Sequence, residues 1–545
     1  MKTKNILSNV KRQCTIKNFI ISSLLMSICN CSLFKTIGIV EHAQDFSGMV
    51  ASDEPNATMI GREIISAGGN SADAIVAMSL ALSVTLPSRA SLGAGGVCLI
   101  YNHNKNTVET LDFIAPPPRQ IFAETDRPTA LLALPRGLFA LSAKYGHLHW
   151  KELVIPAELL ARRGVPMSRV LSNQLRLVAM PLMTNSEMRR IFTKTNGQLL
   201  TEGDLLIQTD LGASLARLRI NGVGELYNGN WCRKIVIDTN ISGGSLSESE
   251  MRDFIPQWRD SVTVPYDNDV AYFTPLAGGL LEAQWWNLLM NGDNTYAATS
   301  VEVRSHLLAE ILSRGLADRQ QWLASNGQIK DIDDILSKTH LAKIMTNYTP
   351  DLHQKSSSIE IPPSSAINGT GLVALDRNGS AVACTIGLNN SFGVGRIIPH
   401  TGILLAAANW VADRGPFDMG PMLVINRNYK EFRYAIASGG GPAAPSSLIQ
   451  TALASLVEGN SLTEAISTKR MFSIPFPDVI FLEEQSTDQL KIRGHQLEKT
   501  SLPSRINVIQ CSSDKILSKL RCAVASDPRG SGLALIAEER NNIHR

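Results

Sequence analysis

The sequence predicts a layered α+β fold whose sheets draw strands from both ends of the chain. Helical patterns and a hairpin come first, a long helical stretch fills the middle, and alternating apolar segments dominate after residue 370. This order is typical of helices packed on sheets in adjacent layers. A length of 545 residues allows one large domain or two to three smaller ones.

Residues 1–31 are predicted to be a targeting segment. Five lysines and arginines and no acid precede or flank the mainly apolar run 19–28. That run has the length of a signal-peptide core and is too short to span a bilayer comfortably. Cys31 lies just after it, where a bacterial lipoprotein carries its lipid. We expect export to the periplasm or a lipid anchor at Cys31 in the bacterial cell envelope. An ordinary signal with incidental cysteines is the alternative.

Charge and cysteine usage exclude several classes of partner. The whole chain has a formal charge of +3, but beyond residue 31 it holds 47 basic against 49 acidic residues, a balance of −2. No long basic stripe remains for nucleic acid or for an anionic membrane surface. The chain has no C-x-x-C pair, so neither a zinc site nor a redox dithiol is predicted, and no cofactor is expected. A disulfide between Cys511 and Cys522 is a candidate.

The first patterned block predicts two helices and a hairpin. A helix over 56–67 ends at Gly68 and Gly69, and Ser71 is expected to cap a second helix over 72–84. The second helix is apolar nearly all round, which predicts full burial. Residues 97–101 and 107–113 alternate as a hairpin.

The middle of the chain reads as helical. Helices are expected at 136–145, 151–163, 168–179, 209–220, 247–254, 279–290 and 300–325. Short strands are expected near 234–238 and 270–274. The polar stretch 330–363 is predicted to be a linker.

The last third predicts strands. Residues 372–376 and 381–386 flank Asn378-Gly379, a strong hairpin signal. A second hairpin is expected from 422–426 and 432–437, followed by a helix over 446–458.

Several motifs occur in one order along the chain. They are Gly68-Gly69-Asn70-Ser71-Ala72-Asp73, Gly93-Ala94-Gly95-Gly96, Leu134-Pro135-Arg136-Gly137, Gly203-Asp204-Leu205, Ala317-Asp318-Arg319 and Ser526-Asp527-Pro528-Arg529. Together, from about residue 49 to 527, they resemble the γ-glutamyltransferase family. The resemblance implies a four-layer αββα N-terminal-nucleophile (Ntn) hydrolase sandwich. It also implies self-cleavage into a large chain, 45–369, and a small chain, 370–545, that stay associated as parts of one domain.

In that family the new N-terminal threonine of the small chain attacks the γ-glutamyl amide of a small-molecule substrate. One residue then supplies the nucleophile and, through its freed amine, the base. The candidate here is Thr370, which follows the linker and begins a strand. The pattern departs from the family at this point, because an ungapped match places Gly369 at the nucleophile position. A strand-entry threonine without a chemical role is the alternative.

Ser438-Gly439-Gly440-Gly441-Pro442 is similar to the family's oxyanion turn. The resemblance places the two backbone donors at Gly440 and Gly441, since amides near a helix start suit a developing negative oxygen. A purely structural strand-to-helix turn is the alternative.

Three further residues are predicted to contact the substrate through the same resemblance. Arg119 corresponds to the arginine that binds the α-carboxylate, Asn389 to the small-chain asparagine, and Asp418 is a candidate for the α-ammonium. The aspartate usual for that ammonium and a serine pair are missing. A catalytically degenerate envelope binding or structural protein, or an acylase-type amidohydrolase with a non-glutamyl substrate, therefore stay open as alternatives.

Overall fold

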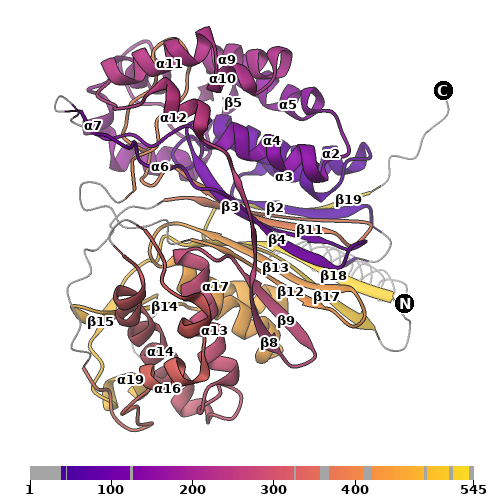
Figure 1. The fold of residues 1–545 in the computed structure, drawn as a ribbon, viewed down its shortest axis with the longest axis vertical. Helices are drawn as coiled ribbons and strands as arrows, with labels where there is room; N and C mark the ends of the chain where they lie inside the picture. Colours follow the sequence, from indigo (N-terminus) through magenta and orange to yellow (C-terminus); the bar gives the residue numbers. More distant parts are fainter. Residues whose placement is uncertain are drawn as a thin grey trace, which may run out of the picture. The chain divides into compact units, whose positions relative to one another are not determined.

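Two central sheets lie between two layers of helices (Figure 1). The computed structural model describes residues 39–43, 46–122, 125, 127–324, 327–355, 368–409, 419–483, 488–514 and 519–538. Residues from Gly38 onward form one unit, and residues 1–37 form a separate one that lies outside the described residues. The expected αββα arrangement is therefore confirmed for the unit that starts at Gly38.

One seven-stranded sheet, here called sheet B, contains strands from both ends of the chain. Its order is β19-β2-β10-β11-β3-β4-β7. The bounds are β2 Gly48–Ser52, β3 Gly95–Asn102, β4 Thr107–Phe113, β7 Gln257–Asp260, β10 Thr370–Asp376, β11 Ala381–Gly387 and β19 Leu533–Ala537. All neighbouring strands pair antiparallel, so both the predicted hairpins at 97–113 and 372–386 are confirmed.

The second seven-stranded sheet, sheet A, has the order β1-β18-β17-β13-β12-β9-β8. Its bounds are β1 Ile39–Ala43, β8 Val262–Tyr266, β9 Asp269–Phe273, β12 Pro421–Asn426, β13 Glu431–Gly439, β17 Arg505–Asp514 and β18 Lys519–Ser526. Two smaller sheets contain β14 Met471–Pro475, β15 Asp478–Leu482 and β16 Leu497–Lys499, and β5 Val165–Pro166 with β6 Leu205–Leu206.

Helices cover the outer face of each sheet. Those beside sheet B are α2 Pro55–Ser66, α3 Ser71–Thr85, α4 Leu134–Tyr145, α5 Trp150–Arg163, α6 Arg169–Leu177, α7 Ala179–Leu182, α8 Ser186–Phe192, α9 Thr209–Asn221, α10 Gly224–Tyr227, α11 Asn230–Ile241 and α12 Glu248–Asp253. Those beside sheet A are α13 Ala277–Asn291, α14 Val301–Trp322, α15 Ile332–Ile335, α16 Lys338–Ile344, α17 Ala444–Ala452, α18 Leu462–Ser467 and α19 Asp488–Ile492.

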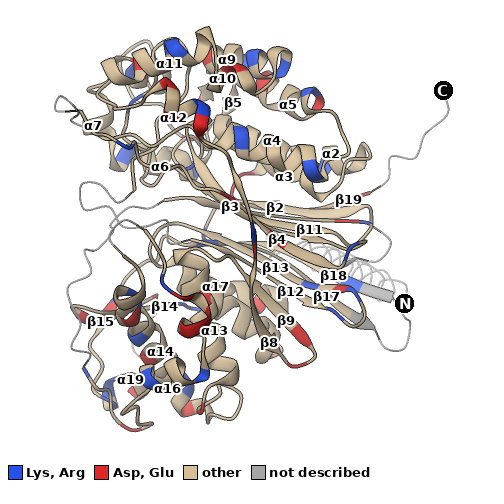
Figure 2. Cartoon of the chain, viewed as in Figure 1, with Lys and Arg blue, Asp and Glu red and all other residues tan. Residues whose placement is uncertain are grey.

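Three apolar layers hold the four structural layers together. One lies between the first helical layer and sheet B, one between the two sheets, and one between sheet A and the second helical layer. Helix α3 is buried along its whole length, as its uniformly apolar sequence predicts. The strands of both sheets carry few charged residues, while the outer helices carry many (Figure 2).

Two disulfides cross neighbouring strands. Cys511 pairs with Cys522 between β17 and β18, which confirms the candidate bond. Cys98 pairs with Cys384 between β3 and β11 and was not expected from the sequence. The second bond joins residues 286 positions apart, from the two regions on either side of residue 370.

Some local expectations were wrong. The cap of α3 is Asn70, whose side chain accepts from the Asp73 amide in a capping box, and Ser71 is already helical. Residues 234–238 lie in helix α11, where Trp231, Ile235 and Val236 bury one helical face and override their strand propensity. Within 330–363, residues 332–335 and 338–344 are helical, so only part of that stretch can be a linker. The helix expected over 446–458 is confirmed in its extent, but its last part, 453–457, is a π-helical turn.

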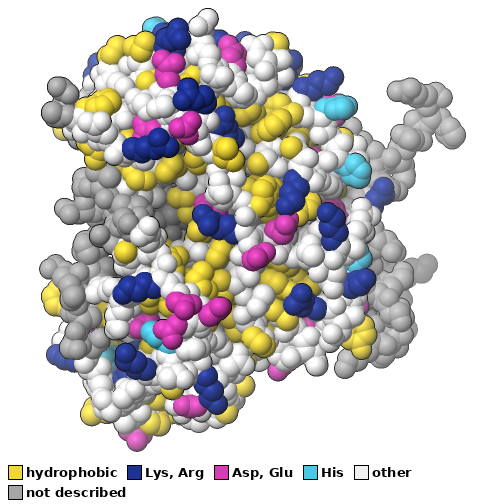
Figure 3. Space-filling view, viewed as in Figure 1, with side chains coloured by type: hydrophobic (Ala, Val, Ile, Leu, Met, Phe, Trp, Pro, Cys, Tyr) yellow, Lys and Arg dark blue, Asp and Glu magenta, His cyan; other side chains and the backbone are white. Residues whose placement is uncertain are grey.

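Within the described residues, none of the helices combines the length and the apolar character that crossing a membrane requires. Basic and acidic side chains are interspersed over the face shown in Figure 3, with hydrophobic side chains between them.

Candidate active site

The start of strand β10 and the end of strand β13 meet between the two sheets. A Cβ atom added at Gly439 would lie 2.5 Å from the Gly369 carbonyl oxygen and 2.6 Å from the Thr370 Cα atom. A Cβ atom added at Gly371 would lie 2.6 Å from the Ala437 backbone. Only glycine permits such close approach of two backbones. The segment 368–371 is therefore held against the turn that contains Gly440 and Gly441.

Thr370 is fully buried, and its hydroxyl contacts a carboxylate. Its Oγ1 donates to Oδ2 of Asp53 at 3.0 Å. Arg89 is also buried, and its Nη1 donates to the same Asp53 oxygen at 3.1 Å and to the Gly369 carbonyl at 3.4 Å. An ion-paired carboxylate and guanidinium thus contact the two residues of the Gly369–Thr370 peptide bond.

Further donors and acceptors hold this ion pair in place. Asn507 Nδ2 donates to the other Asp53 oxygen at 2.8 Å and to the Gly371 carbonyl at 2.9 Å. In the amide orientation that its neighbours favour, Gln174 accepts from Nε and Nη2 of Arg89 at 2.9 Å each. Burial lowers the pKa of Arg89, and the Asp53 carboxylate offsets part of that shift. Removing one partner of such a buried pair typically destabilises a protein by about 3–5 kcal/mol.

The two turn glycines already bind a carbonyl oxygen. The amides of Gly440 and Gly441 donate to the Asn368 carbonyl at 2.6 and 3.1 Å. Both glycines have positive φ, 113° and 93°, which turns their N–H groups toward one oxygen. This is the geometry of an oxyanion hole. The carbonyl that it holds belongs to Asn368, one residue before Gly369.

Gly369 occupies a position with little room for a side chain. Its φ is +74°, and a Cβ atom there would lie 2.3 Å from the Met419 methyl carbon. Opposite it on β11, Gly387 leaves space for the Asn368 side chain, whose oxygen accepts from the Leu388 amide at 3.2 Å.

The structure brings Thr370, Gly440 and Gly441 together, while it shows other contacts for Asn389 and Arg119. The Asn389 amide nitrogen donates to the Ala407 carbonyl at 2.9 Å. The Arg119 side chain is 70% exposed, with its Nη2 atom 3.6 Å from Asp253 Oδ2. Asp418 and Cys31 lie outside the described residues. The substrate-binding roles of these residues stay predictions.

Asp53 and Arg89 were not found from the sequence. Arg89 had a usable signal, since it is the single lysine, arginine, aspartate or glutamate between Asp73 and Lys105. A lone charge in such an apolar stretch must be buried with a partner. Asp53 stands next to Glu54 before a helix and carries no comparable signal.

The arrangement can support attack by a hydroxyl on an amide. Asp53 is placed to accept the Thr370 proton, and Arg89 is placed to stabilise negative charge on the Gly369 oxygen. The amides of Gly440 and Gly441 form a second site for a carbonyl oxygen.

Two solved structures share the fold of this chain. A cephalosporin acylase from Bacillus halodurans superimposes with a TM-score of 0.78 over 94% of this chain and 99% of its own, at 17% identity. The γ-glutamyltranspeptidase of Helicobacter pylori gives 0.53 over 58% of this chain and 95% of its own, at 24% identity. The fold is that of an Ntn hydrolase.

Sequence comparison then gives the family. The model of the gamma-glutamyltranspeptidase family matches residues 57–409 and 412–537. The glutathione hydrolase proenzyme of Escherichia coli is 28% identical over 513 residues, 85% of this chain and 87% of that protein. Glutathione hydrolase 3 of Arabidopsis thaliana is 25% identical, over 84% of this chain and 79% of that protein. This chain belongs to the gamma-glutamyltranspeptidase family, a family of enzymes.

Proposed function

We propose that the chain is a self-processing, glutathione hydrolase-like enzyme that cleaves γ-glutamyl amide bonds of small molecules through Thr370. The contact between the Thr370 hydroxyl and the Asp53 carboxylate carries this proposal. A buried carboxylate at 3.0 Å can accept the hydroxyl proton, which a threonine nucleophile requires. The related proenzyme of Escherichia coli supports maturation of the chain into two parts.

In the processing step the Thr370 hydroxyl attacks the Gly369 carbonyl carbon. Its proton passes by way of Asp53 to the Thr370 nitrogen as the peptide bond breaks, and an ester forms. Water then hydrolyses the ester, leaving a Gly369 carboxylate and a free Thr370 amine. Arg89 lies at the oxygen on which charge develops. The amides of Gly440 and Gly441 would then be free to bind the substrate carbonyl once Asn368 withdraws.

A second candidate is a catalytically degenerate member that binds a ligand and is not processed. One observation favours it specifically. The carbonyl oxygen that the Gly440 and Gly441 amides bind is that of Asn368, and the residue after it, Gly369, has no hydroxyl that could attack this carbonyl. In that register the attacking group is missing.

One gel separates the two candidates. We expect the purified chain to give two bands under denaturing, reducing conditions, with the smaller one beginning at Thr370 and covering 176 residues, 370–545. Thr370→Ala should give one band, while Thr370→Ser should still be cleaved because it keeps a hydroxyl. A single band in the parent, unchanged by Thr370→Ala, would establish the degenerate member.

The substrate class needs a separate comparison. The fold shared with the cephalosporin acylase favours an acylase-type alternative, and the family favours a γ-glutamyl substrate. We expect faster hydrolysis of a γ-glutamyl anilide than of an anilide with an uncharged acyl group. The reverse preference would assign the acylase type.

The localisation proposal rests on the disulfides. Such bonds form and persist in oxidising compartments, so Cys98–Cys384 and Cys511–Cys522 support export to the periplasm or cell envelope behind residues 1–31. Attachment of a lipid to Cys31 is part of the same proposal. Loss of membrane association in Cys31→Ser, with export retained, would identify that anchor.

A further inference from the structure

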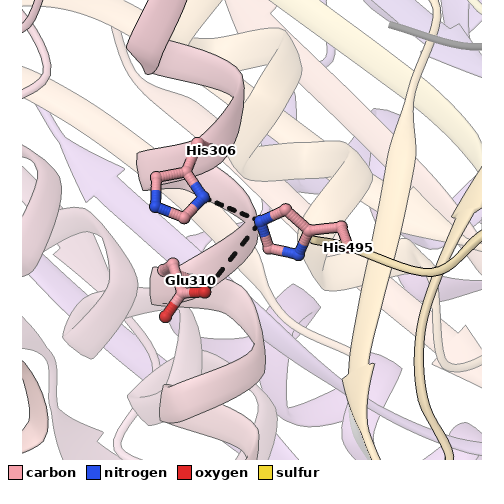
Figure 4. Close-up of side chains that lie close together, drawn as sticks. All are labelled: His306, Glu310 and His495. Carbon is pink, nitrogen blue, oxygen red and sulfur yellow. Dashed lines mark hydrogen bonds and ion pairs between the residues drawn. The ribbon is translucent and has the colours of Figure 1, made fainter. Parts of the chain in front are cut away.

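A buried group of histidines and carboxylates lies in the helical layer beside sheet A, away from the candidate active site. His306 and Glu310 are one turn apart on α14, and His495 comes from the turn between α19 and β16 (Figure 4). The three residues are 0, 2 and 8% exposed. One potential ligand atom from each lies within 4.8 Å of the other two. His306 Nδ1 is 2.7 Å from His495 Nε2, which is 4.0 Å from Glu310 Oε1.

The hydrogen bonds of His306 fix which ring nitrogen can bind a cation. Its Nε2 lies 2.9 Å from the Thr349 carbonyl oxygen, which can only accept, so Nε2 carries the hydrogen. In the neutral ring the lone pair is then on Nδ1, which points at His495 (Figure 4).

Glu310 is likewise oriented by partners outside the group. Its Oε2 accepts from Arg314 Nε at 2.7 Å, and its Oε1 accepts from His353 Nδ1 at 2.5 Å. The other nitrogen of His353 contacts Asp478 Oδ2 at 2.8 Å. Metal ligands are typically held by outer hydrogen bonds of this kind.

We propose that His306 Nδ1, His495 Nε2 and Glu310 Oε1 bind a divalent transition-metal ion, with Zn²⁺ as the matching ion and water completing the coordination. Two imidazoles and a carboxylate are a donor set that zinc uses in proteins. The ion takes the place of the hydrogen that His495 Nε2 now shares with His306 Nδ1, and that hydrogen moves to His495 Nδ1, so that His495 stays a neutral imidazole.

The ion would link elements that are far apart in sequence. It would link α14 to the connection that carries His495, and through Thr349 and His353 to the segment 349–353. Its role is structural, and it is independent of the proposed function.

The test is zinc titration of the full chain, purified without a histidine tag and stripped with a chelator. We expect one Zn²⁺ per chain by calorimetry and elemental analysis, and at least about 100-fold weaker binding in His495→Gln and His306→Gln. His147→Gln with His149→Gln is the matched control, because both side chains are exposed, and it should bind zinc as the parent does. No stoichiometric binding, or equal binding in His495→Gln, would overturn the site and leave a hydrogen-bonded core cluster.

Co²⁺ provides a measurement that needs no variant. In the unmodified chain, Co²⁺ in this site should give the strong visible absorption of a four- or five-coordinate ion, and Zn²⁺ should abolish it. If the chain with Co²⁺ shows no more than the weak absorption of aqueous Co²⁺, the proposal is contradicted. This result does not depend on whether His495→Gln folds.

Discussion

Glu282 is a carboxyl group buried in the helical layer without a compensating charge. It lies on α13, is fully buried, and neither of its oxygens has a hydrogen-bond partner among the described residues. Burial raises its pKa well above the ordinary value of 4.5, and the nearby Gly420 amide, outside hydrogen-bond geometry, offsets only a little of this. Folding therefore favours the protonated form of Glu282 over the ionised form.

We predict that Glu282→Gln stabilises the protein at pH 7 and above. A pKa raised by folding contributes stability that is complete below the unfolded value of 4.5 and is lost as the pH rises toward the folded value. Each tenfold change in the acid dissociation constant on folding corresponds to about 1.4 kcal/mol of unfolding free energy. Urea unfolding of parent and variant from pH 4 to 8 measures the difference, which should vanish toward pH 4. A constant difference across this range would show that Glu282 does not titrate as inferred.

The candidate site shows which residues a sequence can reveal. Thr370, Gly440 and Gly441 could be predicted because each belongs to a local pattern at a strand end. The ion pair of Asp53 and Arg89 could not, since its partners come from positions 36 to 454 residues apart in the chain. Their proximity is created by the pairing of β2 with β10 and by the packing of sheet B on sheet A.

Among the elements, β10 and β13 are in close backbone contact at the site. Gly439, the last residue of β13, packs against the backbone of Gly369 and Thr370. A methyl group on Gly439 would not fit between them. The obstacle there is backbone, which cannot rotate aside as a side chain can. The two sheets can approach this closely only because residue 439 has no Cβ atom.

We predict that Gly439→Ala pushes the strands apart and lowers the free energy of unfolding by about 1–3 kcal/mol, as overpacking does. It should also abolish any cleavage at residue 370, because Asp53 and the Thr370 hydroxyl would be displaced from each other. Gly224→Ala is the control: a Cβ atom there meets nothing within 4 Å, so stability should be unchanged or slightly raised. Equal stability of both variants in urea would show that the sheets yield without strain.

Most elements could be predicted because their periodicity is strong and local. Helix α11 could not, because Ile235, Val236 and Ile237 prefer strands in isolation and only packing makes them helical. The predicted cap of α3, Ser71, lies one residue after the observed cap, Asn70. Asparagine and serine are both good caps, and only the capping-box hydrogen bonds distinguish them.

At the scale of the molecule, the two predicted chains are interleaved. In sheet B, β10 and β11 from the small-chain region lie between β2 and β3 from the large-chain region, and β19 from the C-terminal end borders β2. Neither region can therefore complete a sheet alone. The sequence predicted this sharing of strands, but strand order depends on long-range pairing that local patterns do not encode.

We predict that the two disulfides differ in their effect on stability. In the uncleaved Thr370→Ala background, Cys98→Ser with Cys384→Ser opens a loop of 286 residues, and Cys511→Ser with Cys522→Ser one of 11. Loop-closure entropy predicts a larger loss of unfolding free energy for the first pair, by about 3 kcal/mol. Urea unfolding without reductant gives both losses, and a larger loss for the short loop would indicate strain or residual structure instead.

The Cys98–Cys384 bond has a consequence for the fate of the protein if the 369–370 peptide bond is cut. The two pieces would remain one covalent molecule, because the bond joins a residue before the cut to one after it. Without reductant they would migrate as a single species and refold from denaturant as a unimolecular system, independent of concentration. In an oxidising compartment the small piece could not be lost by dilution, so separation would require a thiol reductant as well as unfolding.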